Sequence, residues 1–398
     1  MRKTIYLTQA GANDSAQRHL VPDAVVRGDM LFTGGVTGYD VKGGLEEWNE
    51  EQASRIYERI DSILDQTGFT KEEIGHWFIW APERHAKIQP VNPYWALWFP
   101  KEDDRPARHA LARALDPGVH YRVEIIGVKN AKRTAYEIND AVYHTGGSGI
   151  RAFMPFGTTM GDILFTGPTY GMYTATRTMG ETAYKQAELC AECNQMLYDM
   201  TGHTVDNLMQ MFVWYHDAES RDAAIKYSSV MFPDPADRPA IHYLHSPLPY
   251  YAQVAGQFLI QYDIIGIKNG RRKLVNVPGV RVMDGEGGAL PGAVAMKDLL
   301  LSSVVLGYDP KSGDLPASLE EQTVNAFNGA RALVEAGGFG AADLAHMYVW
   351  YTDHAARETV DKVWAEQFPN PDDRPARHCV VTDLPAGALV GVEVTATR

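Results

Sequence analysis

One six-residue motif occurs three times along this chain at nearly constant spacing. It is Asp-Arg-Pro-Ala-Arg-His at residues 104–109 and 373–378, and Asp-Arg-Pro-Ala-Ile-His at residues 237–242. The prolines of successive copies are 133 and 136 residues apart. Self-similarity at a fixed period is the signature of a repeated structural unit, and about 130 residues is a normal domain size. The 398-residue chain is therefore predicted to contain three copies of one domain.

Two other patterns repeat at the same spacing. A short apolar run closes with tryptophan in each copy, at residues 77–80, 211–214 and 347–350. Another apolar run ends near a hydroxyl residue, at Thr33, Thr166 and Ser302. Because the tryptophans lie in strand-like apolar runs, they are interpreted as core residues. We expect the three domains at residues 1–134, 135–272 and 273–398.

Each copy has the residue pattern of an α+β domain. A long segment of helical character follows the hydroxyl position, at residues 46–67, 182–201 and 319–336. In the third copy a second helical stretch is expected at 357–367, and alternating valines at 390–394 predict a closing strand. This order predicts helices on one face of a mixed sheet. Three copies can cover their open sheet faces around a pseudo-threefold axis, as in a closed trimer; the alternative is three independent domains on linkers.

The composition argues against several classes of protein. Lys and Arg number 37 against 50 Asp and Glu, and the net charge of −13 disfavours nucleic-acid binding. The longest apolar run, residues 299–305, is too short for a membrane span, and residues 1–9 lack the apolar core of a signal peptide. Three cysteines give no disulfide framework. We therefore expect a cytoplasmic protein without nucleic-acid or membrane partners.

The Pro-Ala-Arg motif, the strand ending in Ser/Thr-Gly and the helix between them together resemble the Rid family, reactive-intermediate deaminases once called the YjgF family. The resemblance covers nearly the whole chain as three units. It implies three tandem chorismate-mutase-like α+β domains that form an intramolecular pseudo-trimer, with sites in the clefts between neighbouring units. It also implies hydrolysis of imines and enamines to a keto acid and ammonia, without a metal or an organic cofactor.

The resemblance assigns substrate-binding residues unevenly to the three units. The family arginine that holds the substrate carboxylate is matched by Arg108 and Arg377, whereas the second unit has Ile241. A guanidinium suits this role because its planar fork binds a carboxylate bidentately and stays charged. A helix position that is commonly Asn in the family is Asn92 in the first unit and Asp361 in the third. At most two of the three clefts are expected to bind acidic substrates.

The expected catalytic acid is missing from its family position. Family deaminases place a water-positioning glutamate in the last strand, and the aligned residues here are Arg122, Gln261 and Gly391. A carboxylate stands two residues later in every copy, as Glu124, Asp263 and Glu393. Period-two geometry places it on the same sheet face, about 7 Å along the strand. Glu124 and Glu393 are therefore candidate bases or structural acids. Thr33 and Ser302 are candidates for orienting water or the leaving nitrogen.

A histidine follows the arginine position in each copy, at His109, His242 and His378. Its reference pKa near neutrality suits acid–base chemistry. Adjacent strand residues point to opposite faces, so the Arg and His of one unit are not expected to share a cleft, although packing of neighbouring units is left open as a way to bring them together. The histidines are interpreted as structural. Cys379 is interpreted as a free buried thiol, with a nucleophilic role as the alternative. The chain has no His-Glu-x-x-His or paired Cys-x-x-Cys motif, and no metal site is predicted.

The second unit also differs in length. Ile241 and Asp263 are 22 residues apart, against 16 in the other units, and the added residues around 246–251 include two prolines and two tyrosines. A lid over a neighbouring cleft and a packing extension both stay open.

The sequence thus predicts cofactor-free hydrolytic deamination of a small acidic imine or enamine, or a closely related C–N hydrolysis. The alternatives are another hydrolase on the same plan, such as one that opens a nitrogen heterocycle, and a non-catalytic ligand-binding or scaffold protein. Further homo-oligomerisation stays open. The expected ligand in every case is a small-molecule carboxylate, and no cofactor is expected.

Overall fold

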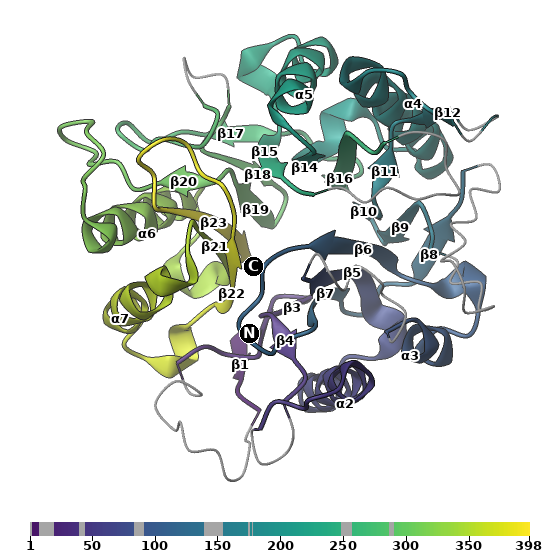
Figure 1. The fold of residues 1–398 in the computed structure, drawn as a ribbon, viewed down its shortest axis with the longest axis horizontal. Helices are drawn as coiled ribbons and strands as arrows, with labels where there is room; N and C mark the ends of the chain where they lie inside the picture. The colour runs from purple at the N-terminus through teal and green to yellow at the C-terminus, as the bar shows by residue number, and fades with distance from the viewer. Residues whose placement is uncertain are drawn as a thin grey trace.

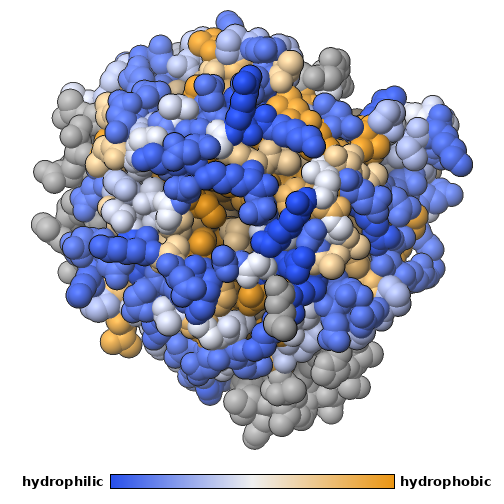
Figure 2. Space-filling view, turned by 180° about the vertical axis from the view of Figure 1, so that it is seen from behind, coloured by the Kyte–Doolittle hydropathy of each residue, from blue (hydrophilic) through white to orange (hydrophobic). Residues whose placement is uncertain are grey.

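Three seven-stranded sheets with the same strand order make up most of the computed structural model (Figure 1). The structure describes residues 2–7, 20–39, 44–82, 91–138, 154–173, 176, 178–247, 257–285 and 290–398. Figure 1 shows the sheets around the centre of the molecule with the helices outside them, and both chain ends near the middle. From behind, hydrophilic residues cover much of the surface, and hydrophobic residues show between them (Figure 2). No helix among the described residues is long and apolar enough to cross a membrane.

The first sheet has the order β1–β2–β3–β7–β5–β6, with β4 paired to β7. Its strands are β1 (Arg2–Ile5), β2 (Ala24–Arg27), β3 (Met30–Thr33), β4 (Val36–Thr37), β5 (Ile74–Ala81), β6 (Ala107–Ala112) and β7 (Arg122–Val128). Strands β5 and β6 are parallel, whereas the other pairs are antiparallel. A parallel pair needs a crossover connection, and helix α3 (Val91–Trp98) lies within it. The edge strand β6 carries the first copy of the Pro-Ala-Arg motif.

The second and third sheets repeat this order. The second contains β8 (Arg133–Tyr136), β9 (Gly157–Met160), β10 (Ile163–Thr166), β11 (Thr169–Tyr170), β14 (Leu208–Tyr215), β15 (Ala240–His245) and β16 (Ile260–Ile267). The third contains β17 (Lys273–Val275), β18 (Ala293–Met296), β19 (Leu299–Ser302), β20 (Val305–Leu306), β21 (Leu344–Tyr351), β22 (Ala376–Val381) and β23 (Val390–Thr397). A small separate hairpin joins β12 (Met172–Tyr173) to β13 (Thr178–Met179). Residues 248–251 of the predicted insertion lie outside the described residues.

The helices confirm the predicted helical segments to within three residues. They are α2 (Asn49–Thr67), α4 (Ala183–Thr201), α5 (Ala218–Met231), α6 (Leu319–Ala336) and α7 (Arg357–Gln367), in addition to α3. Gly68 and Gly202 end α2 and α4 with φ of 75° and 71°. This left-handed conformation costs glycine little because it has no Cβ.

Each sheet has one face toward its helices and one toward the other two sheets. In the first unit, Ile56 and Ile60 of α2 belong to the same buried apolar cluster as Trp77 and Ile79 of β5. The intervening Phe78 points to the opposite face, as the period of a strand requires, and belongs to a second cluster built from all three sheets.

The three repeated tryptophans lie in that shared cluster, so the prediction that they are core residues is confirmed. Trp80, Trp214 and Trp350 are at most 1% exposed. The ring centroid of Trp80 lies 6.1 Å from that of Trp214 and 6.4 Å from that of Trp350. The inner faces of the three sheets thus share one apolar interior, which places each Pro-Ala-Arg strand beside a neighbouring sheet.

Candidate functional site

A cavity of about 420 Å³ lies between the first and third sheets, and we call it the Arg377 cleft. Its charged lining residues are Asp23, Arg59, Asp116, Arg122, Arg357 and Arg377. Gly34, at the end of β3, allows the two sheets to approach, because a Cβ there would lie 2.8 Å from the Arg377 carbonyl oxygen. Four arginines against two aspartates give the lining an excess of positive charge, which suits an anionic ligand.

Arg377 lies on β22, the edge strand of the third sheet, and its side chain is 1% exposed. Nη2 forms an ion pair with Asp361 of α7, and Cζ lies 4.5 Å from the centroid of the Trp364 ring. Within the described part of the chain, the buried Nη1 atom has no hydrogen-bond partner. A buried donor without a partner costs free energy, and an acceptor that bonded to this atom would recover it.

Arg122 of β7 reaches from the first unit to the third. It donates from Nη1 to the carbonyl oxygen of Cys379 at 3.2 Å and from Nη2 to Asp116 at 2.6 Å. Arg357 donates to the same Asp116 carboxylate at 3.0 Å. Burial raises the pKa of Asp116, but these two guanidiniums outweigh it and hold the pKa below its usual value. Asp116 is therefore an ionised structural acid and a weak proton acceptor.

Sequence reasoning missed four of the charged residues in the cleft, namely Asp23, Arg59, Asp116 and Arg357. Arg59 of α2 pairs with Asp23 at 2.5 Å, so this pair contributes no net charge. All four lie outside the repeated motifs, and a single sequence gives no signal for them. Arg122 did give a signal, because it stands at the position of the family glutamate.

The predicted residues Arg108 and Asn92 lie together in the first unit. Arg108 is 0% exposed and donates from Nη2 to the side-chain oxygen of Asn92 at 2.9 Å. Its Nε lies 3.1 Å from the sulfur of Met154, and its Cζ lies 4.6 Å from the Trp95 ring centroid. The corresponding Ile241 is 1% exposed and lies in the apolar core of the second unit.

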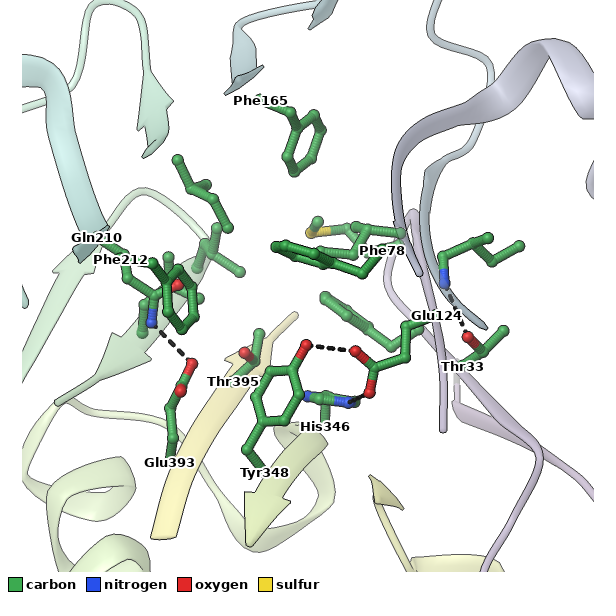
Figure 3. Close-up of a pocket in the computed structure, with 17 residues that line it drawn as sticks. Thr33, Phe78, Glu124, Phe165, Gln210, Phe212, His346, Tyr348, Glu393 and Thr395 are labelled. Carbon is green, nitrogen blue, oxygen red and sulfur yellow. Dashed lines mark hydrogen bonds and ion pairs between the residues drawn. The ribbon is translucent and has the colours of Figure 1, made fainter. Parts of the chain in front are cut away.

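The predicted bases Glu124 and Glu393 point into the molecular interior, where they line a small cavity of about 40 Å³. Glu124 accepts hydrogen bonds from Trp80 Nε1 at 3.0 Å and from the Tyr348 hydroxyl at 2.5 Å. Figure 3 shows Tyr348 and Glu124 pointing toward each other, and Gln210 pointing toward Glu393, with 2.9 Å between their bonded atoms. Neither acid is among the residues that line the Arg377 cleft.

The predicted hydroxyls Thr33 and Ser302 are buried and bridge strands. Thr33 accepts a hydrogen bond from the backbone N–H of Ile125 at 2.9 Å, a contact visible in Figure 3. Ser302 accepts the equivalent bond from the N–H of Val394 at 2.8 Å. Thr33 therefore links β3 to β7, and Ser302 links β19 to β23.

The three repeated histidines each pair with a carboxylate of another sheet. The pairs are His109 with Asp263, His242 with Glu393, and His378 with Glu124. They join the first sheet to the second, the second to the third and the third to the first. All six side chains are at most 4% exposed, so the pairs are buried contacts between units.

The expectation that the Arg and His of one unit do not share a cleft is wrong in the third unit. Arg377 and His378 both line the Arg377 cleft, together with the free, buried Cys379. The residues do alternate between faces, but β22 is an edge strand and the cavity extends around that edge. Among the described residues, no group of three or more His, Cys, Asp or Glu side chains is arranged to hold a metal.

Comparison with known proteins gives the following similarities. The family model described as Endoribonuclease L-PSP matches residues 12–129 and 288–398, more than half of the chain. The second predicted unit, residues 135–272, lies entirely outside these ranges. A RutC family protein of Aquifex aeolicus is 26% identical over 107 residues, which are 27% of this chain and 86% of that protein. The 2-iminobutanoate/2-iminopropanoate deaminase of Escherichia coli K12 is 28% identical over 107 residues, 26% of this chain and 84% of the relative.

Solved structures are also similar to parts of the chain. The match to Escherichia coli TdcF with bound serine spans 32% of this chain and 98% of the TdcF chain, with 24% sequence identity and a TM-score of 0.29. The match to a chorismatase spans 82% of this chain and 93% of the chorismatase chain, with 13% sequence identity and a TM-score of 0.49.

Proposed function

Because the chain belongs to the family described as Endoribonuclease L-PSP, which includes the Rid deaminases, we propose that it hydrolyses a small imine or enamine that carries a carboxylate. The observation that supports this function is Arg377, whose Nη1 is buried at a positively charged cleft without a hydrogen-bond partner in the described chain. We do not propose the ribonuclease activity that the family description names, because a net charge of −13 repels the phosphate backbone of RNA.

In the proposed reaction, Arg377 binds the substrate carboxylate and thereby fixes the C=N carbon in the cleft. Water adds to that carbon to give a carbinolamine. The C–N bond then breaks, and the products are a keto acid and ammonia. The arginine contributes orientation and charge neutralisation, which a planar guanidinium supplies at any working pH.

We infer further that the three units are tandem copies of the family domain arranged as an intramolecular trimer. The repeated motifs, the identical strand orders and the shared apolar interior support this arrangement. The Arg377 cleft is then the counterpart of a cleft between subunits. The three cysteines are free and buried, which supports a cytoplasmic location.

The test is turnover of 2-iminopropanoate, generated in situ from L-alanine by an amino-acid oxidase. We expect the protein to release pyruvate and ammonia faster than spontaneous hydrolysis does. Arg377→Ala should lower kcat/KM about 10- to 100-fold, since it removes a charge-assisted hydrogen bond. Arg55→Gln, on the outer surface of α2, is the matched arginine control and should retain activity.

Two other outcomes would favour the alternative functions. Hydrolysis of cyclic amides without turnover of imines would favour opening of a nitrogen heterocycle. Binding of carboxylates without any turnover would favour a ligand-binding or scaffold protein.

A further inference from the structure

We infer that His378 is the general base of the Arg377 cleft, accepting a proton on Nε2 from the attacking water, while Glu124 holds the ring in place. The inference rests on the proposed function, because it assigns the proton acceptor for that hydrolysis. It also supplies a base to a cleft in which Arg122 occupies the position of the family glutamate.

The two equivalent histidines use both ring nitrogens in structural contacts. His109 bonds through Nδ1 to Asp263 at 2.6 Å and through Nε2 to Gln261 at 3.1 Å. His242 lies 3.1 Å from Glu393 through Nδ1, and its Nε2 bonds to the Ser302 carbonyl oxygen at 2.9 Å. Neither ring retains a nitrogen for a ligand.

His378 differs from His109 and His242 in the bonding of one ring nitrogen, Nε2. Its Nδ1 pairs with Glu124, as in the other two pairs, but its Nε2 is buried without a hydrogen-bond partner in the parts of the chain described. Arg122 stands where Gln261 contacts His109, and its terminal nitrogens bond to Asp116 and to a backbone carbonyl. Arg122 therefore has other partners and does not bond to Nε2 of His378 as Gln261 bonds to Nε2 of His109.

The ring carbon next to Nε2 lies beside another residue of the cleft. His378 lines the cleft, and its Nδ1 is turned inward toward Glu124. Its Cδ2, which is bonded to Nε2, lies beside Gly35, another lining residue, so closely that a Cβ at Gly35 would be 2.9 Å away. A side chain at this position would collide with the ring and with Arg122, whose Cδ lies closer still to the same Cβ position.

The electrostatics favour a neutral ring with a basic Nε2. Burial lowers the pKa of His378, Glu124 raises it, and Arg122 and Arg357 lower it further, so that the net shift is downward. Burial raises the pKa of Glu124, but His378, His346 and Tyr348 outweigh it, so the carboxyl is ionised. An ionised Glu124 holds the proton on Nδ1 and leaves the lone pair on Nε2, the division of roles found in Ser-His-Asp triads.

The proton transfers balance over one turnover. Water forms the C–O bond to the carbon of a protonated imine, the C=N electron pair moves to nitrogen, and one water proton moves to Nε2. The carbinolamine then loses its nitrogen. Nε2 returns its proton to that nitrogen, the hydroxyl proton follows, and a keto acid and an ammonium ion leave. No other reactant is required.

Asp116 is the other acid–base candidate in the cleft. Its carboxylate is bound by Arg122 and Arg357, and His354 lies 3.2 Å from it. These contacts hold its pKa below the usual value, which makes it a poorer proton acceptor than a neutral imidazole.

The test compares His378→Asn with the matched variants His109→Asn and His242→Asn, which remove equivalent buried pairs. We expect all three to lower Tm by similar amounts, and only His378→Asn to lower kcat by about 100-fold or more while KM changes little. Turnover of His378→Asn equal to that of the two controls would overturn the inference and leave the proposed function intact. Absence of imine turnover by the wild-type protein would overturn both.

A second measurement needs no variant and covers the case in which His378→Asn fails to fold. In the wild-type protein, kcat/KM should fall as pH falls through a single pKa below 6.5, because protonation occupies Nε2. The titratable groups that face the ring are Glu124, Arg122, His346, Tyr348 and Arg357. A profile that stays flat from pH 8 down to the pH at which the protein unfolds would overturn the role of His378.

Discussion

The first and third copies of the Asp-Arg-Pro-Ala-Arg-His motif are identical, yet their arginines have different surroundings. Arg108 donates to the neutral amide of Asn92, and the sulfur of Met154 lies 3.1 Å from its Nε. Arg377 pairs with the carboxylate of Asp361 and lies in a cleft of about 420 Å³. The motif positions a guanidinium in both units, but the residues around it decide what the guanidinium can do.

The residues that a neighbouring unit contributes also decide what the repeated histidine can do. Beside the third unit, the first contributes Arg122, which leaves Nε2 of His378 without a partner among the described residues. Beside the first unit, the second contributes Gln261, which bonds to Nε2 of His109. In the proposed tandem arrangement, each interface between units can diverge separately. One interface has the groups that a site needs, and another uses the equivalent groups to hold the sheets together.

The largest expected effect contrasts the stabilities of Arg377→Met and Arg108→Met. Removing Arg377 leaves the Asp361 carboxylate with only the longer contact to Arg357 at 3.7 Å, which should cost up to about 3–5 kcal/mol. Removing Arg108 breaks its hydrogen bond to the neutral Asn92 amide and leaves no ionised partner in that bond, at a cost of about 1–3 kcal/mol. Urea unfolding of both variants at pH 7 measures the difference.

The double variant Arg377→Met, Asp361→Asn is the control, because it removes the buried charge as well. It should recover most of the stability lost in Arg377→Met. Equal costs for the two single variants would show that the two arginines have equivalent electrostatic surroundings, contrary to the structure.

The next effect concerns His76, which lies on the inner face of β5. Burial lowers its pKa from 6.5 to about 4, although Asp263, the Thr166 carbonyl and Glu124 raise it and His109 lowers it. Between these two pH values the unfolded chain binds a proton at this position and the folded chain does not, so stability falls as pH falls. The loss from this residue should reach about 3 kcal/mol near pH 4.

The second unit provides the matched substitution for this prediction. Its equivalent residue, Gln210, does not titrate and donates to the Ser302 carbonyl at 3.4 Å, as His76 contacts the Thr166 carbonyl at 3.1 Å. His76→Gln should therefore flatten the decline of stability from pH 6.5 to pH 4, and Gln210→His should steepen it. Urea unfolding at several pH values gives the slopes, and parallel slopes in all three proteins would exclude this assignment.

Much of the fold could be predicted because each sequence pattern occurs three times at nearly the same spacing. The helix at 319–336 and the closing strand with Val390, Val392 and Val394 have clear periods, and the structure confirms both. Burial of the three tryptophans followed from their place in apolar strands. These features depend on local pattern, which a sequence displays directly.

The site was harder to predict because it depends on distant contacts. Arg377 and His378 could be singled out from their motif, but their sharing of a cleft depends on β22 being an edge strand. Asp116 and Arg357 are 241 residues apart and meet only through packing of the first unit on the third. Glu124 could be named as an acid, whereas its partner His378 belongs to another unit. Spacing within one unit carries no information about such pairs.

The smallest expected effect tests which cleft binds the acid product. A ligand that binds only the folded state at ten times its Kd stabilises it by about 1.4 kcal/mol. Pyruvate at that concentration, compared with chloride at equal ionic strength, should raise the free energy of unfolding of the wild type and of Arg108→Met by this amount. The increment should vanish in Arg377→Met, because Arg377 lines the cleft whereas Arg108 does not. A decrease in both variants would mean that two clefts bind carboxylates, and an unchanged increment in Arg377→Met would place the binding elsewhere.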